Sequence, residues 1–314
     1  MMKKNMWSRW ILALAVVWPF MAAARDRVRE KENFDFDWKF ILNADDRANA
    51  GMQVSEAGWQ DVQLPHDWSI SQNFDPKLSG SNGHLPGGIG WYRKTFRVDK
   101  KDKGRRIAVL FDGIYSRSDV YVNGQHLGFR PYGFCYQEHD LTPHLNYGAE
   151  NVLAVRVNNP LEHDSVARWY TGAGIYRHAW LVKTAEVHVA SYGTYVTTPV
   201  VTAERAEVRV RTSVANESKR IKTLSVRQQI TDGEGRTVVQ SGKQALQVAA
   251  GQTADTEHTL EIPRPQLWDT EHPYLYTLHT TVYDGRKLVD TYETVFGVRT
   301  CEFTSDRGFL LNGK

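Results

Sequence analysis

Apolar and polar residues alternate along most of the chain, which is the pattern of β-strands that bury one face. The segment 151–157 reads NVLAVRV and places Leu153, Val155 and Val157 on one face, with Arg156 on the other. The same period of two recurs in 207–216 (EVRVRTSVAN) and 223–230 (TLSVRQQI). Almost nothing after residue 24 has the 3.6-residue period of a long amphipathic helix.

Turn-forming residues separate these expected strands. Asn123-Gly124 and Asp284-Gly285 are signals for two-residue hairpin turns, in which both central residues need positive φ. TDGEG at 231–235 predicts a third turn, and Asn312-Gly313 follows an expected strand at 309–311. Many short strands joined by such turns are typical of β-sandwiches, so we expect an all-β protein.

The expected strands form two groups, and the boundary is predicted near Thr184-Ala185-Glu186. Residues 30–185 are rich in Trp, Tyr and Gly and contain long loops. Residues 186–299 have short, even strands over about 110 residues, a length typical of an immunoglobulin-like sandwich.

Residues 1–24 have the features of a secretory signal peptide. A start that carries Lys3, Lys4 and Arg9 precedes an apolar stretch, and three alanines end the segment at Ala24. The stretch is about half of the ~20 residues that span a bilayer, so we expect cleavage after Ala24 rather than a membrane anchor. The predicted location is therefore secreted or periplasmic.

Without the three basic residues of this leader, the 39 Lys and Arg residues of the full sequence fall to 36, against 36 Asp and Glu. This balance does not favour nucleic acid as a partner. The chain has only two cysteines, Cys135 and Cys301, which excludes a disulfide framework. We expect two free thiols.

Motifs that carry catalytic chemistry are scarce. The sequence has no P-loop, G-x-S-x-G or H-E-x-x-H motif, and no spacing that predicts a metal site. Three acid–histidine neighbours occur at 66–67, 138–140 and 162–164. Adjacent residues of a strand point to opposite faces, so these neighbours are interpreted as solvated strand ends and loops.

Aromatic pairs are better candidates for function, because sugars pack their apolar C–H faces on aromatic rings. Trp169-Tyr170 precedes the glycine-rich loop 171–175, and sugar contact and core packing are equally open for it. Core positions are expected for Trp38, Trp59, Trp91 and Trp180. Arg93 and Arg177 lie between aromatic residues in strand-like segments and are predicted to be buried or paired structural arginines.

Several of these segments, taken in order, resemble glycoside hydrolase family 2, and especially its secreted β-galactosidase-like members. The sugar-binding domain of that family is similar to DFDWKF, WQDVQLPHDWSI, GGIGWYRKTF, VYVNGQHLG, DLTPHLNYGAENVLAVRVNN and RWYTGAGIYRHAWL. Its immunoglobulin-like domain resembles IPRPQLWDTEHPYLYTLHTTV and YETVFGVRT, and EFTSDRGFLLNGK resembles the hairpin that introduces its catalytic (β/α)₈ barrel.

The resemblance implies a jelly-roll-like (galactose-binding-like) β-sandwich over 25–185, an immunoglobulin-like β-sandwich over 186–299, and the start of the barrel at 300–314. It also implies a retaining mechanism with two glutamates, both in the barrel. A barrel needs about 250 residues, so this chain alone is predicted to be inactive, with no catalytic residue, no cofactor and no metal.

The resemblance further implies that loops of the first domain contact the terminal sugar of an oligosaccharide or glycan substrate. The matching residues here are Asn158, Asn159, Arg168, Trp169 and Tyr170, and a second loop offers Asn82 or His84. Many relatives carry Asp where Asn158 stands, and an amide retains hydrogen bonding without the charge. An ordered surface loop is the alternative for both segments.

Three functions follow from these observations. The first is the non-catalytic N-terminal part of a secreted, retaining β-galactosidase-like glycosidase that acts on terminal β-linked sugars, with the barrel as its intramolecular partner; β-glucuronidase and β-mannosidase are the runners-up. The second is a stand-alone secreted carbohydrate-binding β-sandwich protein. The third is a structural or adhesive protein without a ligand.

Overall fold

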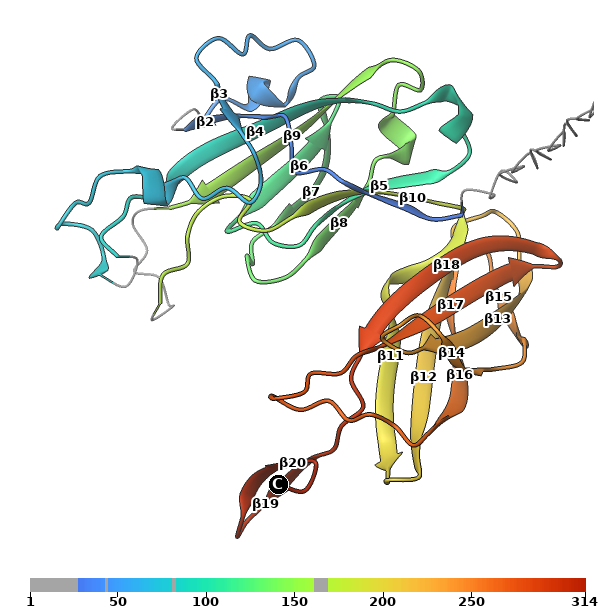
Figure 1. Ribbon diagram of the computed structural model, residues 1–314. Helices are drawn as coiled ribbons and strands as arrows, with labels where there is room; N and C mark the ends of the chain where they lie inside the picture. The colour runs from blue at the N-terminus through green and yellow to red at the C-terminus, as the bar shows by residue number, and fades with distance from the viewer. Residues whose placement is uncertain (1–27, 43–44, 81–82, 161–168) are drawn as a thin grey trace, which may run out of the picture.

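The computed structural model describes residues 28–42, 45–80, 83–160 and 169–314, and it contains two β-sandwiches, as predicted (Figure 1). The expected signal peptide lies outside the described residues, as does the acid–histidine segment 162–164. Within the described part of the chain, helices are single 3₁₀ turns, and none is long and apolar enough to cross a membrane.

The first sandwich packs a six-stranded antiparallel sheet against a four-stranded one. The six-stranded sheet has the order β3 (Gln60–Val62), β2 (Trp38–Leu42), β4 (Gly88–Arg97), β9 (Glu150–Asn159), β6 (Ser118–Val122) and β7 (Gln125–Arg130). The four-stranded sheet has the order β1 (Glu30–Asn33), β10 (Ala179–Thr184), β5 (Arg106–Phe111) and β8 (Gln137–Asp140). The 3₁₀ helices of this domain are η1 (Arg47–Ala50), η2 (Ser69–Ser71), η4 (Lys100–Asp102) and η5 (Thr142–His144).

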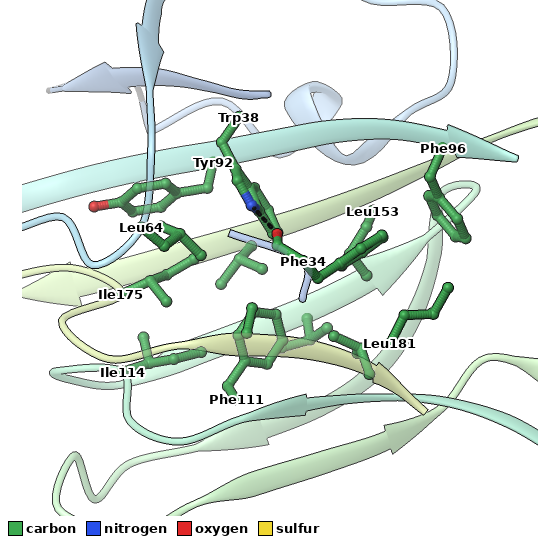
Figure 2. Close-up of a cluster of buried hydrophobic side chains, with 14 of the residues drawn as sticks. Phe34, Trp38, Leu64, Tyr92, Phe96, Phe111, Ile114, Leu153, Ile175 and Leu181 are labelled. Atoms are coloured by element: carbon green, nitrogen blue, oxygen red, sulfur yellow. Dashed lines mark hydrogen bonds between the residues drawn. The ribbon is translucent and has the colours of Figure 1, made fainter. Parts of the chain in front are cut away.

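Aromatic rings fill the space between these two sheets (Figure 2). Trp38 is fully buried, donates its indole N–H to the carbonyl of Phe34 at 2.7 Å, and packs at an angle against Phe111. Tyr92 and Leu153 come from the neighbouring strands β4 and β9 of the six-stranded sheet. The core position predicted for Trp38 is confirmed.

A second, smaller cluster covers the outer face of the six-stranded sheet. Trp91 is fully buried there against Tyr121, which confirms its predicted core position. Arg93 lies beside this cluster, and its guanidinium bonds the Glu56 carboxylate at 3.1 Å and the carbonyls of Asn49 and Gly51. The prediction of a buried, paired arginine is confirmed for Arg93.

Three sequence interpretations need correction. Arg177 is exposed at a bend after Tyr176, so it is not a buried structural arginine. Trp59 and Trp180 are half-buried rather than core residues, because each packs on the outer surface of a sheet. The Trp180 indole donates to Asp112 at 2.9 Å, and the Lys31 ammonium lies over its ring.

The solvated interpretation of the acid–histidine neighbours is also wrong in part. His139 is buried, and burial together with the nearby Arg130 lowers its pKa to about 4. Glu138 points to the opposite face of β8 and pairs with Arg106 at 2.6 Å, whereas Asp140 is exposed. His66 is half-buried, with Nδ1 at 2.7 Å from the Tyr92 hydroxyl.

The second sandwich packs a three-stranded sheet against a five-stranded one. The former has the order β11 (Val187–Val201), β12 (Arg205–Asn216) and β16 (Gln252–Pro263). The latter has the order β14 (Thr237–Gln240), β13 (Lys222–Thr231), β17 (Tyr276–Asp284) and β18 (Lys287–Phe296), with β15 (Gln244–Val248) paired to β13. Along β12 the inward residues Val208, Val210, Thr212 and Val214 are buried, as the alternation predicts.

The predicted turns form, with one shift of register. Asn123-Gly124 joins β6 to β7 with positive φ at both residues. The loop between β17 and β18 is Gly285-Arg286, one residue later than predicted. A further hairpin joins β19 (Cys301–Thr304) to β20 (Gly308–Leu311), and Asn312-Gly313 turns the chain after it with φ of 51° and 77°. Cys135 and Cys301 are free thiols, as predicted.

Ion pairs join the two sandwiches. Arg29, just before β1, bonds both carboxylate oxygens of the fully buried Asp290 on β18, at 3.0 and 2.8 Å. Arg106 on β5 bonds Glu217, which follows β12, at 2.8 Å. The outer face of the four-stranded sheet therefore lies against the second sandwich near β11 and β18 (Figure 1).

Candidate functional site

The candidate site lies at the end of the first sandwich where β4 begins and β9 ends. Glycines make this end of the sheet close-packed. A Cβ on Gly87 would lie 2.2 Å from the carbonyl oxygen of Asn159, and one on Gly90 would lie 2.8 Å from the Trp68 ring. Glycine lets the backbone of Asn159 approach at position 87 and lets the Trp68 and Phe40 rings pack at position 90, which explains these two glycines of the sequence 85–90.

The two asparagines predicted to contact sugar point to opposite faces of β9, as adjacent strand residues must. Asn159 is buried, and its side-chain amide donates to the carbonyl of Gly172 at 3.1 Å, so it fixes the loop that follows Tyr170. Asn158 pairs with Ile89 in the sheet and is half-buried. Of the two, Asn158 is therefore the more available to a ligand.

Trp169 and Tyr170 are surface residues, with 59% and 41% of their area exposed. This exposure excludes core packing for both residues, and sugar contact stays a prediction. Trp169 has its ring centroid 6.3 Å from that of Phe134. Tyr170 donates its hydroxyl to the Asp67 carboxylate at 2.6 Å, and burial together with this carboxylate raises the pKa of the phenol. A neutral, fixed phenol and an exposed indole can each pack against the apolar face of a sugar ring.

Asp67 is the residue that sequence reasoning missed. Besides the Tyr170 hydroxyl, its carboxylate accepts the backbone N–H groups of Ser69 at 3.0 Å and Ala173 at 2.9 Å. It joins the segment after β3 to the loop 170–173, and a Cβ on Gly172 would lie 2.7 Å from it. The order Asp-x-Ser at 67–69 was a signal for this local turn, because Asp often bonds the backbone two residues later.

Phe134 extends the exposed aromatic surface beyond Trp169. Its ring contacts Tyr115 and Tyr132 at centroid distances of 5.1 and 5.7 Å. The loop is held in place because Tyr176 donates its hydroxyl to the carbonyl of Gly133 at 2.9 Å. Tyr132 and Phe134 are 62% and 43% exposed, so this surface is available to a ligand.

The second predicted loop is described only in part. Asn82 lies outside the described residues, as does Arg168 of the first loop. His84 is exposed with a φ of 58°, and its Nδ1 lies 2.8 Å from the carbonyl of Leu78. A Cβ on Gly83 would lie 4.0 Å from the ring of Tyr170, so this loop passes beside the first one.

The side chains of this site are suited to binding and recognising a ligand. Exposed rings lie beside amide, hydroxyl and carboxylate groups, a combination that suits a neutral molecule with apolar faces and many hydroxyls. Among the described residues, no group of three or more His, Cys, Asp or Glu side chains is placed to hold a metal ion.

Comparison with known proteins identifies the relatives of both sandwiches. Residues 32–185 match the model of the glycosyl hydrolases family 2 sugar binding domain, and residues 187–299 match the glycosyl hydrolases family 2 model. A β-galactosidase, BoGH2A of Bacteroides ovatus, is 42% identical over 91% of this chain and 33% of its own length. A β-glucuronidase of Formosa agariphila is 34% identical over 91% of this chain and 31% of its own.

Solved structures agree with these matches. A glycosyl hydrolase family 2 member from Bacteroides cellulosilyticus superposes with a TM-score of 0.82 and 37% identity, over 90% of this chain and 37% of its own. A family 2 β-glucuronidase superposes with a TM-score of 0.83 and 33% identity, over 91% of this chain and 32% of its own. The chain therefore spans about a third of the length of the relatives it matches. It belongs to glycoside hydrolase family 2, and the part present here corresponds to the sugar-binding domain and the domain that follows it.

Proposed function

We propose that this chain is the substrate-contacting, non-catalytic part of a β-galactosidase-like glycoside hydrolase that removes terminal β-linked sugars with retention of configuration. The observation that carries the proposal is the exposed pair Trp169-Tyr170, which Asp67 and Asn159 hold at the edge of the sugar-binding domain. The β-galactosidase relative is more similar to this chain than the β-glucuronidase relative is, and this favours a galactoside.

The roles that we propose for individual residues follow from the fold. A retaining glycosidase needs two carboxylates about 5 Å apart in a cleft that encloses the scissile bond. The described residues form β-sandwiches, and Asp67 already accepts three hydrogen bonds that shape the loop. Asp67 therefore positions Tyr170 and is not the nucleophile. Asn158, Trp169 and Tyr170 contact the sugar, together with Arg168, Asn82 or His84 from the same two loops. Export to the periplasm or the medium, where polymeric glycans occur, is part of the proposal.

The test is calorimetric titration of the chain with methyl β-D-galactopyranoside and, separately, with methyl β-D-glucopyranosiduronate. We expect weak binding of the galactoside, with a Kd of roughly 1 mM, because one sugar unit contacts few side chains. Replacement Trp169→Ala should weaken it about tenfold, in line with an aromatic contact of about 1.4 kcal/mol.

The matched control is Tyr195→Ala, which removes a ring on the second sandwich that is 61% exposed, close to the 59% of Trp169. This variant should bind as the unchanged chain does. Incubation with nitrophenyl β-galactoside should give no turnover. Turnover by the chain, or equal affinity of the Trp169→Ala and unchanged chains, would overturn the proposal.

A further inference from the structure

A pocket at the junction of the two sandwiches is separate from the Trp169 site. Its volume is about 320 Å³, within the range of small-molecule sites. Leu110 and Val182 lie on the outer face of the four-stranded sheet and form its apolar floor, and both are 6% exposed. Tyr192 of β11 and Tyr292 of β18 line its other sides. We call it the junction pocket.

An irregularity in β11 supplies one of these walls. The pairing of β11 with β12 shifts register between Val189 and Thr194, which marks a bulge, and Tyr192 within it has a φ of 53°. Gly193 is needed beside it, since a Cβ there would lie 2.7 Å from the carbonyl oxygen of Ala190. Bulges of this kind redirect a side chain. Here the Tyr192 ring reaches the first sandwich and packs on Tyr136 with the centroids 4.6 Å apart.

The pocket is preformed, because contacts between the two sandwiches hold its walls in place. Arg29 bonds Asp290 at its base and lies with its guanidinium over the Tyr292 ring at 4.8 Å. The Tyr292 hydroxyl accepts the backbone N–H of Tyr192 at 3.1 Å, and the Tyr192 hydroxyl donates to Asp112 of the first sandwich at 3.4 Å. A cleft whose walls are fixed in this way costs little conformational entropy when a ligand enters.

The chemistry of the lining is mixed. Besides the apolar floor and the two tyrosines, the hydroxyl residues Ser191 and Thr291 and the charged residues Lys31 and Glu293 line the pocket. Arg29 also lines the pocket but is paired with Asp290, and Lys31 and Glu293 carry opposite charges, so the lining has no net charge once Asp290 is counted. A pyranose ring presents apolar C–H faces to aromatic rings and hydroxyls to donors and acceptors around its edge, which matches this lining.

We propose that the junction pocket binds one neutral pyranose unit of a saccharide, as a second binding site apart from the Trp169 site. The choice of ligand class rests on the proposed function, whereas the pocket itself does not. Such a site would hold a second part of a glycan, or a second glycan, on the side of the first domain that faces the second sandwich.

The test follows the amide signals of Val182 and Thr291 by NMR while the full chain is titrated with methyl β-D-galactopyranoside. We expect both signals to shift in a saturable way. The same titration of the Trp169→Ala variant should leave these shifts unchanged, which separates the junction pocket from the site of the proposed function. Replacement Tyr192→Ala should reduce the affinity read from these signals at least fivefold.

Because Tyr192 also bridges the two sandwiches, a second variant is needed that fills the pocket without removing this residue. Thr291→Trp should abolish the shift of Val182, whereas Tyr195→Ala, three residues after Tyr192 and in the same strand, should leave it intact. The proposal is overturned if the two signals do not shift, if Thr291→Trp leaves the shift of Val182 unaltered, or if only methyl β-D-glucopyranosiduronate produces it.

Discussion

Replacement of Arg29 by alanine is expected to destabilise the chain strongly, because it leaves a buried carboxylate without its guanidinium partner. Asp290 has no exposed side-chain area, and the Arg29 side chain is 14% exposed. The guanidinium makes two hydrogen bonds to the carboxylate and one to the carbonyl of Val189 at 2.6 Å. After the replacement, Asp290 keeps the backbone N–H of Val189 at 2.7 Å.

The expected magnitude follows from this geometry. Removal of one partner of a buried ion pair costs about 3–5 kcal/mol of unfolding free energy. The partial exposure of Arg29 and the remaining Val189 donor place the expected loss at the lower end, about 3 kcal/mol. Burial already raises the pKa of Asp290, an effect that Arg29 opposes. Without Arg29 the folded-state pKa rises further above the unfolded value, so the deficit should grow as pH rises and shrink as pH falls.

Urea unfolding followed by circular dichroism measures this loss of unfolding free energy at pH 7 and pH 5. The comparison requires that the slope of unfolding free energy against urea concentration is the same for the variant and the unchanged chain. Lys39→Ala is the control, because the pair of Lys39 with Asp61 is exposed and its loss should leave the unfolding midpoint where it was. Adding Asp290→Asn to Arg29→Ala should restore part of the stability by removing the charge. If Arg29→Ala and Lys39→Ala unfold at the same urea concentration, the ion pair does not stabilise the chain and the reasoning fails.

Three further predictions concern packing, protonation and the site. Gly174→Ala should cost about 1–3 kcal/mol in urea unfolding, because its Cβ would lie 2.4 Å from the Tyr92 hydroxyl oxygen, whereas Gly242→Ala, which meets open space, should not. Burial and Arg106 lower the pKa of His188 to about 4, below its unfolded value near 6.5. The stability that this residue contributes is therefore present above pH 6.5, and about 3 kcal/mol of unfolding free energy is lost as pH falls from there to 4. A His188→Gln chain with the same acid dependence would contradict this. Asp67→Ala should weaken galactoside binding in calorimetry, because the Tyr170 hydroxyl loses its acceptor. Asp67→Asn retains a carbonyl acceptor and should weaken binding less. Equal losses of affinity in the two variants would indicate that hydrogen-bond geometry at this residue does not matter.

The alternation of apolar residues predicted most of the strands because each has one face in a core. The same alternation predicts that Asn158 and Asn159 point to opposite faces of their strand, although the resemblance to relatives implied that both contact the sugar. The hairpin turns were predictable since Asn-Gly pairs supply positive φ locally. These features depend on neighbours in sequence.

Features that depend on distant partners were not predictable in this way. The exposure of Arg177 is set by where the loop 171–178 leaves the sheet, and its aromatic neighbours in sequence gave a wrong expectation. Asp67 acquires its importance from Tyr170, about a hundred positions later. Gly193 is a local signal for a bulge in β11, but the direction of Tyr192 toward the first sandwich follows from pairing with β12 and from the contact with Tyr136.

A crystal structure of the chain soaked in methyl β-D-galactopyranoside well above its Kd tests the sugar-contacting role most directly. We expect one galactoside packed on the Trp169 ring, within hydrogen-bond distance of Tyr170 or Asn158, and with its glycosidic bond intact. A Trp169 surface that stays empty while the sugar is in the same crystal at saturating concentration would contradict that role, as would a cleaved galactoside.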